Sequence, residues 1–239
     1  MSISIIQSVF AHMNEDLVLG IDEAGRGPGI GPMVLAAVAL DDASRTFLER
    51  AGVRDSKDFG SSVAGKKSRA RLASLIREHA CWTAVEVCEV ADVDAYVARS
   101  ALNQLERERA CLLIRRAPKC ARIIADGHTL FSPMTVELPH LEAVDRAESV
   151  HTAVAAASIC AKALRDELFE AIAQRYQPEF GALRGGGYVN TATLAFVGEY
   201  VRRHGQLPPE ARKSWPWHGV PGLDQDNSTT TALPVPRVR

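Results

Sequence analysis

Several acidic residues of this sequence occupy positions from which their carboxylates could converge on one site. Most of them end short apolar runs, and such runs predict strands. If these strands are neighbours in one sheet, the carboxylates at their ends converge. The acids concerned are Asp22 and Glu23 after the run 17–21, Asp126 after the run 122–125, and Asp145 and Glu148 shortly before a helical stretch.

Carboxylates in close quarters raise one another's pKa or bind a cation. Oxygen ligands without His or Cys favour Mg²⁺ or Mn²⁺. Sites of this kind commonly handle phosphates with two ions, one activating water and the other stabilising the leaving oxygen. The pattern therefore predicts phosphodiester hydrolysis.

Two observations weigh against reading these acids as ligands from position alone. A single acid at a strand end is more often solvated or capping than bound to metal. Adjacent strand residues also face opposite sides of a sheet. Asp22 and Glu23 can then serve one site only if the strand ends or bulges there, which the glycines from Gly25 onward permit.

The elements that must position these acids alternate between strand and helix, which predicts an α/β domain with helices packed on a mixed sheet. Ser61 or Ser62 is a candidate helix cap, and Pro118 ends the helical pattern that opens at Asp92. The expected strands are 17–21, 33–40 and 83–87, and the expected helices are one after Ser62, one from 92 toward 118, 152–176 and 191–204.

The loop GRGPGIGP, residues 25–32, differs from the common phosphate-binding glycine motifs. It lacks the Lys-Ser/Thr of a P-loop, no frame gives G-x-G-x-x-G, and a strand rather than a helix follows. Its glycines would instead let the backbone approach a bulky ligand, with Arg26 available for phosphate or sugar.

The charge balance and the apolar content of the sequence limit the partners and the location that we expect for the protein. Lys plus Arg number 28 and Asp plus Glu 29, so a polyanion partner needs a local basic face. The segment 202–213 has such an excess, although a solvated helix end explains it equally well. No run of about 20 uncharged apolar residues and no secretory signal pattern is present, so we expect a cytoplasmic protein that does not bind membranes.

The five cysteines include no C-x-x-C pair. This argues against a disulfide framework and against a zinc site. We expect most of them to be buried free thiols.

Six motifs occur in an order that resembles ribonuclease HII, of the type 2 ribonuclease H family. Together they cover residues 17 to about 217, nearly the whole chain. The motifs are GIDEAGRGPGIGP from residue 20, RDSKDF from 54, IIADGH from 123, AAASICAKALRD from 155, GGGY from 185 and RKSW from 212.

The resemblance implies a ribonuclease H-like fold, a mixed five-stranded sheet flanked by helices with a C-terminal helical part. It implies a catalytic domain over residues 17–217, preceded by an N-terminal extension at 1–16. The Gly, Pro, Asn, Ser and Thr that are frequent after Trp217 predict a disordered tail at 218–239. The implied enzyme is a monomeric, Mg²⁺- or Mn²⁺-dependent endonuclease. It cuts RNA in RNA–DNA hybrids and incises DNA at embedded ribonucleotides, leaving 3′-hydroxyl and 5′-phosphate ends.

The resemblance also implies roles for single residues. Asp22, Glu23 and Asp126 match the first three acids of the family's site. The GRG loop would read the ribose at an RNA–DNA junction, where backbone amides can approach the 2′-hydroxyl. The implied substrate-binding residues are Gly25, Arg26 and Gly27 of that loop, Ser56, Lys57 and Lys162 as phosphate contacts, and Tyr188 stacking on the next sugar.

The fourth acid departs from the ribonuclease HII pattern. That family usually has Asp ten residues before the Ser of its AAASI helix, and here this position holds Glu148. A Glu at this position resembles ribonuclease HIII. Asp145 remains the alternative if the helix entry is longer, and the extra methylene of Glu could alter metal preference or rate.

Three rival functions stay open at this point. A ribonuclease HIII-like enzyme would cut only longer hybrids, and a binding module would recognise hybrids without cutting them. A nucleotide-dependent oxidoreductase is disfavoured by the glycine pattern.

Overall fold

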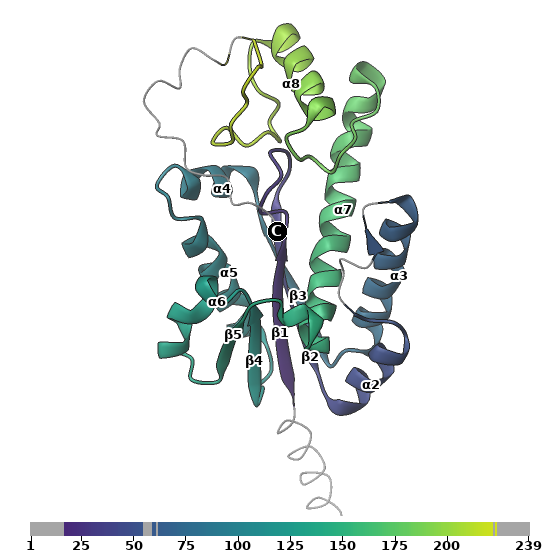
Figure 1. The fold of residues 1–239 in the computed structure, drawn as a ribbon, viewed down its shortest axis with the longest axis vertical. Helices are drawn as coiled ribbons and strands as arrows, with labels where there is room; N and C mark the ends of the chain where they lie inside the picture. The colour runs from purple at the N-terminus through teal and green to yellow at the C-terminus, as the bar shows by residue number, and fades with distance from the viewer. Residues whose placement is uncertain (1–16, 55–58, 61, 222, 224–239) are drawn as a thin grey trace, which may run out of the picture. The chain divides into compact units, whose positions relative to one another are not determined.

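The computed structural model describes residues 17–54, 59–60, 62–221 and 223, and its ribbon is drawn in Figure 1. The chain divides into two compact units. Unit 1 comprises Met1–Ala24, Val34–Glu86 and Asn103–Ala163, and unit 2 comprises Gly25–Met33, Val87–Leu102 and Leu164–Arg239. The predicted domain limits 17–217 and the predicted tail remain predictions.

The sheet has five strands in the order β3-β2-β1-β4-β5. β1 pairs antiparallel with β2 and parallel with β4, and β4 pairs parallel with β5. The predicted mixed five-stranded sheet is therefore confirmed. The strands are β1 (Val18–Ala24), β2 (Met33–Leu40), β3 (Trp82–Cys88), β4 (Arg122–Asp126) and β5 (Leu141–Val144).

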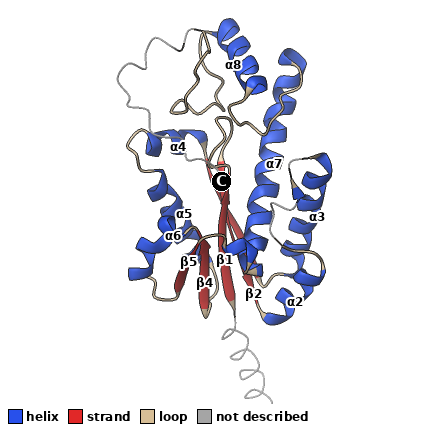
Figure 2. Ribbon diagram, viewed as in Figure 1, coloured by secondary structure: helices blue, strands red, loops and turns tan. Residues whose placement is uncertain are grey.

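Helices cover both faces of the sheet in unit 1, as the ribbon of Figure 2 shows. All eight residues of β2 are buried, which only a strand covered on both faces can achieve. On one side lie α2 (Asp42–Arg50), α3 (Val63–His79) and the first part of α7 (Thr152–Phe180), and on the other lie α5 (Leu102–Arg116) and α6 (His128–Phe131).

The start of α7 packs directly on β1 at Gly20. A Cβ atom at this position would lie 2.1 Å from the backbone carbon of Ala153, which no side chain could tolerate. The glycine thus sets how closely the helix approaches the strand that carries Asp22.

The helix starts in unit 1 have local capping causes. Ser62 accepts a 3.1 Å hydrogen bond from the Gly65 N–H and caps α3, which confirms the predicted cap. Asp41 and Ser44 form a capping box at the start of α2, a helix that the sequence pattern did not indicate.

The prediction of one continuous helix from Asp92 toward Pro118 is wrong. The stretch from Asp92 toward Pro118 forms α4 (Val90–Val97) and α5, separated by a turn. Ser100 adopts φ 58°, a left-handed conformation that cannot continue a right-handed helix. The apolar periodicity on both sides of this turn concealed the break.

Unit 2 contains the second part of α7 and α8 (Thr191–His204). Asn190 caps α8 by accepting a 3.0 Å hydrogen bond from the Thr193 N–H, and Gly205 ends it at φ 71°. The predicted limits of α8 are confirmed, whereas α7 extends beyond the predicted Tyr176 to Phe180. The core of the unit is formed by residues such as Ile30, Phe169, Phe196, Val197 and Trp217.

The remaining elements are short, and two of them surround β5. These are the 3₁₀ helices η2 (Ser132–Val136) and η3 (Ala147–Ser149).

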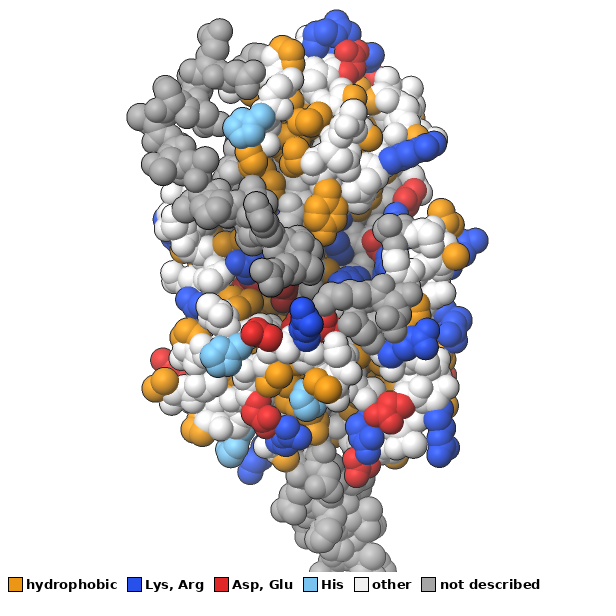
Figure 3. Space-filling view, viewed as in Figure 1, with side chains coloured by type: hydrophobic (Ala, Val, Ile, Leu, Met, Phe, Trp, Pro, Cys, Tyr) orange, Lys and Arg blue, Asp and Glu red, His pale blue; other side chains and the backbone are white. Residues whose placement is uncertain are grey.

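No helix in the described ranges has the length and apolar character that crossing a membrane requires. On the face drawn in Figure 3, Lys and Arg side chains are interspersed with Asp and Glu, in keeping with a net charge of −1.

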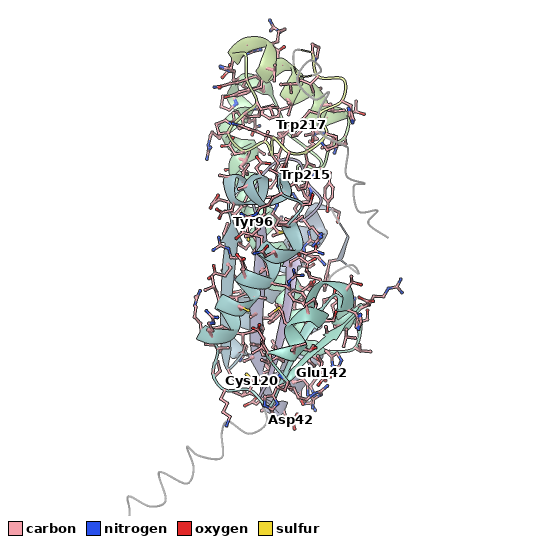
Figure 4. The ribbon with its side chains drawn as sticks, turned by 90° about the vertical axis from the view of Figure 1, so that its left-hand side faces the viewer. Asp42, Tyr96, Cys120, Glu142, Trp215 and Trp217 are labelled. Atoms are coloured by element: carbon pink, nitrogen blue, oxygen red, sulfur yellow. The ribbon has the colours of Figure 1, made fainter. Side chains whose placement is uncertain are left out.

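The cysteines are all free thiols, but the expectation that most are buried is wrong. Cys88 and Cys160 are buried, Cys111 and Cys120 are partly exposed, and Cys81 is exposed. Cys81 and Cys120 lie in the connections that precede β3 and β4, where the chain has left the covered part of the sheet. Figure 4 shows Cys120 at the end of the sheet where β4 begins.

Candidate active site

Asp22 and Asp126 lie on two neighbouring parallel strands at the same level. The register of β1 and β4 pairs Ile21 with Ala125, and each of these residues is followed by one of the acids. Parallel strands bring residues at equal register positions to the same end of a sheet. Asp22 is buried, with 5% of its surface exposed, and Asp126 is partly buried.

Glu148 reaches Asp126 through the turn that follows β5. Asp126 pairs with Val144 in the sheet, and Arg146 then takes a left-handed conformation, φ 58°, that turns the chain into η3. The Ala147 N–H donates a 2.8 Å hydrogen bond to Asp126 Oδ1. Glu148, only 3% exposed, hydrogen-bonds to the Asp126 side chain and contributes to raising its pKa.

Asp145, the alternative fourth acid, instead accepts a hydrogen bond at the start of α6. Its Oδ1 accepts a 2.7 Å hydrogen bond from the N–H of His128, the first residue of α6. A carboxylate at a helix start satisfies a peptide donor that has no partner within the helix. This contact supports Glu148 over Asp145 as the fourth acid of the site.

The expectation that β1 ends or bulges at Asp22 and Glu23 is wrong. Its pairing with β2 continues without interruption through Glu23 to Ala24, because β2 supplies a partner for every residue. Adjacent strand residues project to opposite faces, so a shared ion depends on the reach of the longer Glu23 side chain. The two charges are nevertheless close enough that Glu23 raises the pKa of Asp22.

Burial and repulsion between the carboxylates raise the pKa of both aspartates of the site. Burial, then repulsion from Glu23, raises the pKa of Asp22 from 3.8 to about 8. Burial, then repulsion from Asp22, raises the pKa of Asp126 from 3.8 to about 7. A divalent cation beside these groups would favour their ionised forms and reverse both shifts.

The donors present fit a hard divalent cation, because they are carboxylate oxygens without sulfur or imidazole. In the described part of the chain, no group of three or more His, Cys, Asp or Glu side chains has the arrangement of a metal site. Metal binding by Asp22, Glu23, Asp126 and Glu148 therefore stays a prediction, supported by donor chemistry and by the raised pKa values.

Lys162 is linked to the acids through Ser158. Both residues belong to the part of α7 in unit 1, and Lys162 Nζ donates a 3.0 Å hydrogen bond to Ser158 Oγ. Ser158 hydrogen-bonds to Asp22, and both Ser158 and the Lys162 charge lower the pKa of that carboxyl. The structure thus brings Lys162 to the acids, whereas the predicted phosphate contacts Ser56 and Lys57 lie outside the described residues.

The glycine loop that follows the first acids belongs to unit 2. Gly25 has φ +86°, and a Cβ at this position would lie 2.9 Å from both Arg165 Nε and the Pro32 oxygen. Only glycine fits both requirements. The N–H groups of Gly29 and Ile30 donate to the oxygen of Gly187 at 2.9 and 3.1 Å, which joins this loop to the GGGY motif.

Tyr188, the last residue of the GGGY motif, presents its ring to solvent. Its exposed fraction is 49%, the highest among the aromatic side chains of the described residues. An exposed aromatic ring beside a loop held by backbone hydrogen bonds offers a stacking surface for a sugar or base. The structure thereby connects Tyr188 with the loop that contains Gly25, Arg26 and Gly27.

Comparison with known proteins identifies the family. The family model of ribonuclease HII matches residues 19–217. The chain belongs to the ribonuclease HII family. Ribonuclease HII of Thermofilum pendens is 34% identical over 83% of this chain and 95% of its own length, and that of Caldivirga maquilingensis is 35% identical over 83% and 91%.

Solved structures agree with this assignment. Ribonuclease H2 from Pyrococcus horikoshii OT3 superposes with a TM-score of 0.72 at 27% identity, covering 84% of this chain and 94% of that one. Ribonuclease HII of Archaeoglobus fulgidus, solved as a complex with PCNA, gives 0.69 at 30% identity, covering 84% and 95%. Bst-RNase HIII in complex with Mn²⁺, at 22% identity and 0.59, shares the fold.

Membership of the ribonuclease HII family determines the general activity. The protein is an endoribonuclease that acts on RNA–DNA hybrids, and enzymes of this family are typically metal-dependent. The non-cutting binding module and the oxidoreductase considered from the sequence are thereby wrong. The identity of the fourth acid is not decided by this membership.

The basic segment 202–213 of this ribonuclease HII does not form one cationic face. Arg202 and Arg203 are paired with Glu199 on the exposed end of α8, as the solvated-helix alternative predicted. Arg212 is instead completely buried. Its side chain donates to backbone oxygens of the glycine loop. No sequence pattern indicated this role, because the partners are far away in the chain.

Proposed function

We propose that this ribonuclease HII cuts RNA–DNA hybrids and also incises DNA duplexes at embedded ribonucleotides. Asp22, Glu23, Asp126 and Glu148 would hold Mg²⁺ or Mn²⁺. The observation that carries the proposal is the meeting of Asp22, Asp126 and Glu148 in unit 1, with the pKa values of the two aspartates raised toward neutrality.

The reaction is hydrolysis of a phosphodiester. Water adds to the phosphorus, the bond from phosphorus to the 3′-oxygen breaks, and the products carry a 3′-hydroxyl and a 5′-phosphate. Two bound divalent ions would supply activation of the water and stabilisation of the leaving oxygen. The carboxylates of Asp22 and Asp126 fix the position of the reaction, since both extend from paired strands.

The protein's other residues bind and orient the substrate in this proposal. Lys162, close to Asp22, offers a cation to the phosphate that is cut. The peptide groups of Gly25, Arg26 and Gly27 approach the ribose, because glycine leaves room beside the backbone. Tyr188 stacks its exposed ring on the neighbouring sugar.

The decisive assay uses a labelled DNA duplex with a single ribonucleotide, incubated with Mg²⁺ or Mn²⁺. We expect incision beside the ribonucleotide and none in the all-DNA duplex. A continuous RNA–DNA hybrid serves as the positive control. Cleavage of the hybrid without any incision at the single ribonucleotide would refute the proposal and support the ribonuclease HIII-like alternative, which Glu148 leaves open.

A further inference from the structure

Arg212 is a buried cation whose hydrogen-bond partners are backbone oxygens. Nη2 donates to the Gly25 oxygen at 2.6 Å, Nη1 to the Arg26 oxygen at 3.1 Å, and Nε to the Gly31 oxygen at 3.0 Å. Among the described residues, no carboxylate lies within ion-pair distance of this guanidinium. Burial lowers its pKa from 12.5 to about 9.

Two tryptophans complete the contacts around Arg212, and Figure 4 labels both. Trp215 Nε1 donates to the Gly27 oxygen at 2.9 Å, and its ring lies 4.7 Å from the Arg212 guanidinium carbon. Trp217 Nε1 donates to the Arg212 oxygen at 2.8 Å. We call Arg212 and Trp215, with the oxygens they hold, the carbonyl clasp.

The segment that carries the clasp is fixed from its other side by Asp94 of α4. The Asp94 carboxylate accepts hydrogen bonds from the N–H groups of Lys213 and Ser214, at 2.8 and 3.0 Å. It also accepts one from the Ser214 hydroxyl. The backbone between Arg212 and Trp215 is therefore held at each of its residues.

The clasp determines which way the peptide groups of the glycine loop face. The oxygens of Gly25, Arg26 and Gly27 all accept from the clasp. The peptide bonds are trans, so each N–H points opposite to the oxygen of the same peptide group. The N–H groups of Arg26 and Gly27 consequently point away from the Arg212 and Trp215 donors, and the third peptide ends at Pro28, which has no N–H.

We infer that Arg212, together with Trp215, positions this loop for recognition of the 2′-hydroxyl. By turning three successive carbonyls inward, the clasp presents two adjacent peptide donors to the ribose oxygen. A guanidinium suits this task because it places donors on three separate nitrogens in one plane, whereas a lysine carries all its donors on a single nitrogen. The inference deepens the proposed function and rests on it for the identity of the ligand.

The test compares Arg212→Lys and Trp215→Phe with the wild type, and uses Arg45→Lys on exposed α2 as the matched control. Trp215→Phe keeps an aromatic side chain, although a smaller one, and removes the hydrogen bond to Gly27, so it also serves if Arg212→Lys does not fold. Binding to duplexes with one ribonucleotide or none is measured by fluorescence anisotropy in EDTA. Cleavage is measured as kcat and KM, and Mn²⁺ binding by calorimetry.

Loss of one hydrogen bond to an uncharged carbonyl predicts a roughly fivefold smaller preference for the ribonucleotide duplex in Trp215→Phe. Arg212→Lys should lose about tenfold or more, because two or three hydrogen bonds go together. The loss should appear mainly in KM, with Mn²⁺ affinity unchanged. An undiminished preference in both variants would overturn the inference, as would a parallel loss of Mn²⁺ affinity.

Amide hydrogen exchange of residues 25–31 separates this inference from the proposed function. Both clasp variants should exchange faster there, and Arg45→Lys should not. If the wild type itself shows no preference for the ribonucleotide, the proposed function fails. The exchange rates then decide alone, because rates unchanged by the clasp substitutions contradict the clasp and faster rates support it.

Discussion

Replacement of Asp22 by asparagine should stabilise the metal-free protein while abolishing its activity. Asp22 is 5% exposed, and its pKa is raised from 3.8 to about 8, first by burial and then by repulsion from Glu23. Between these two values the folded protein binds a proton that the unfolded chain has released. The stability of the metal-free wild type therefore falls as the pH rises from about 4 to about 8.

The size of the effect follows from the two pKa values. Each pKa unit is worth about 1.4 kcal/mol, so the full difference corresponds to an upper limit of about 6 kcal/mol above pH 8. Asparagine has the same shape and carries no charge, but it forfeits the attraction between Asp22 and Lys162. We expect a gain of about 3 kcal/mol at pH 9, which raises the melting temperature by roughly 6–12 °C.

The assay is thermal unfolding in EDTA at pH 5 and pH 9. The gap between Asp22→Asn and the wild type should be large at pH 9 and small at pH 5, where Asp22 is protonated in the wild type. Mg²⁺ or Mn²⁺ should stabilise the wild type at pH 9 more than the variant. Asp145→Asn is the control, because loss of its hydrogen bond to His128 should lower stability at both pH values.

The reasoning is refuted if Asp22→Asn melts at or below the wild type at pH 9 in EDTA. A gap that does not depend on pH would also contradict it, since the stabilisation would then come from packing rather than from charge.

Three further predictions concern single residues. Glu148→Gln should reduce cleavage by at least about 100-fold in a hybrid-cutting assay, whereas Asp145→Asn should retain most activity, and the reverse result would exchange their roles. Tyr188→Ala should raise KM for a ribonucleotide-containing duplex roughly tenfold through lost stacking, while Tyr188→Phe should change it little. Gly25→Ala should lower the free energy of unfolding by about 1–3 kcal/mol in urea, because its φ of +86° disfavours a side chain, and unchanged stability would refute this.

The sequence predicts well those parts of the site that depend on neighbouring strands. Asp22 and Asp126 each follow a compact apolar run, and the parallel pairing of those runs brings the acids to one level. The limits predicted for β2, residues 33–40, match the structure, because Gly and Pro precede the strand and Asp41 follows it. For these strands, residues close by in the sequence were enough to make the prediction.

The sequence failed where distant parts of the chain decide the structure. β1 continues past its acids to Ala24 because β2 offers partners for every residue, which overrides the flexibility of the glycines that follow. Arg212 donates to the oxygen of Gly25, 187 residues earlier, so no local pattern could separate it from the exposed Arg202 and Arg203. The fold, and not the motif, gives this arginine its role.

Both units bury charge at a cost to stability, and in each the charge fixes the direction of polar groups. In unit 1 the carboxylates of Asp22 and Asp126 are kept in mutual repulsion by paired strands. In unit 2 the Arg212 guanidinium is removed from water and compensated by peptide oxygens. An apolar residue at either place would be expected to give a more stable protein. The proposed reaction accounts for the buried charge in each unit. In the proposed function, the phosphate needs cations held by the acids, and the 2′-hydroxyl needs peptide donors held in one direction.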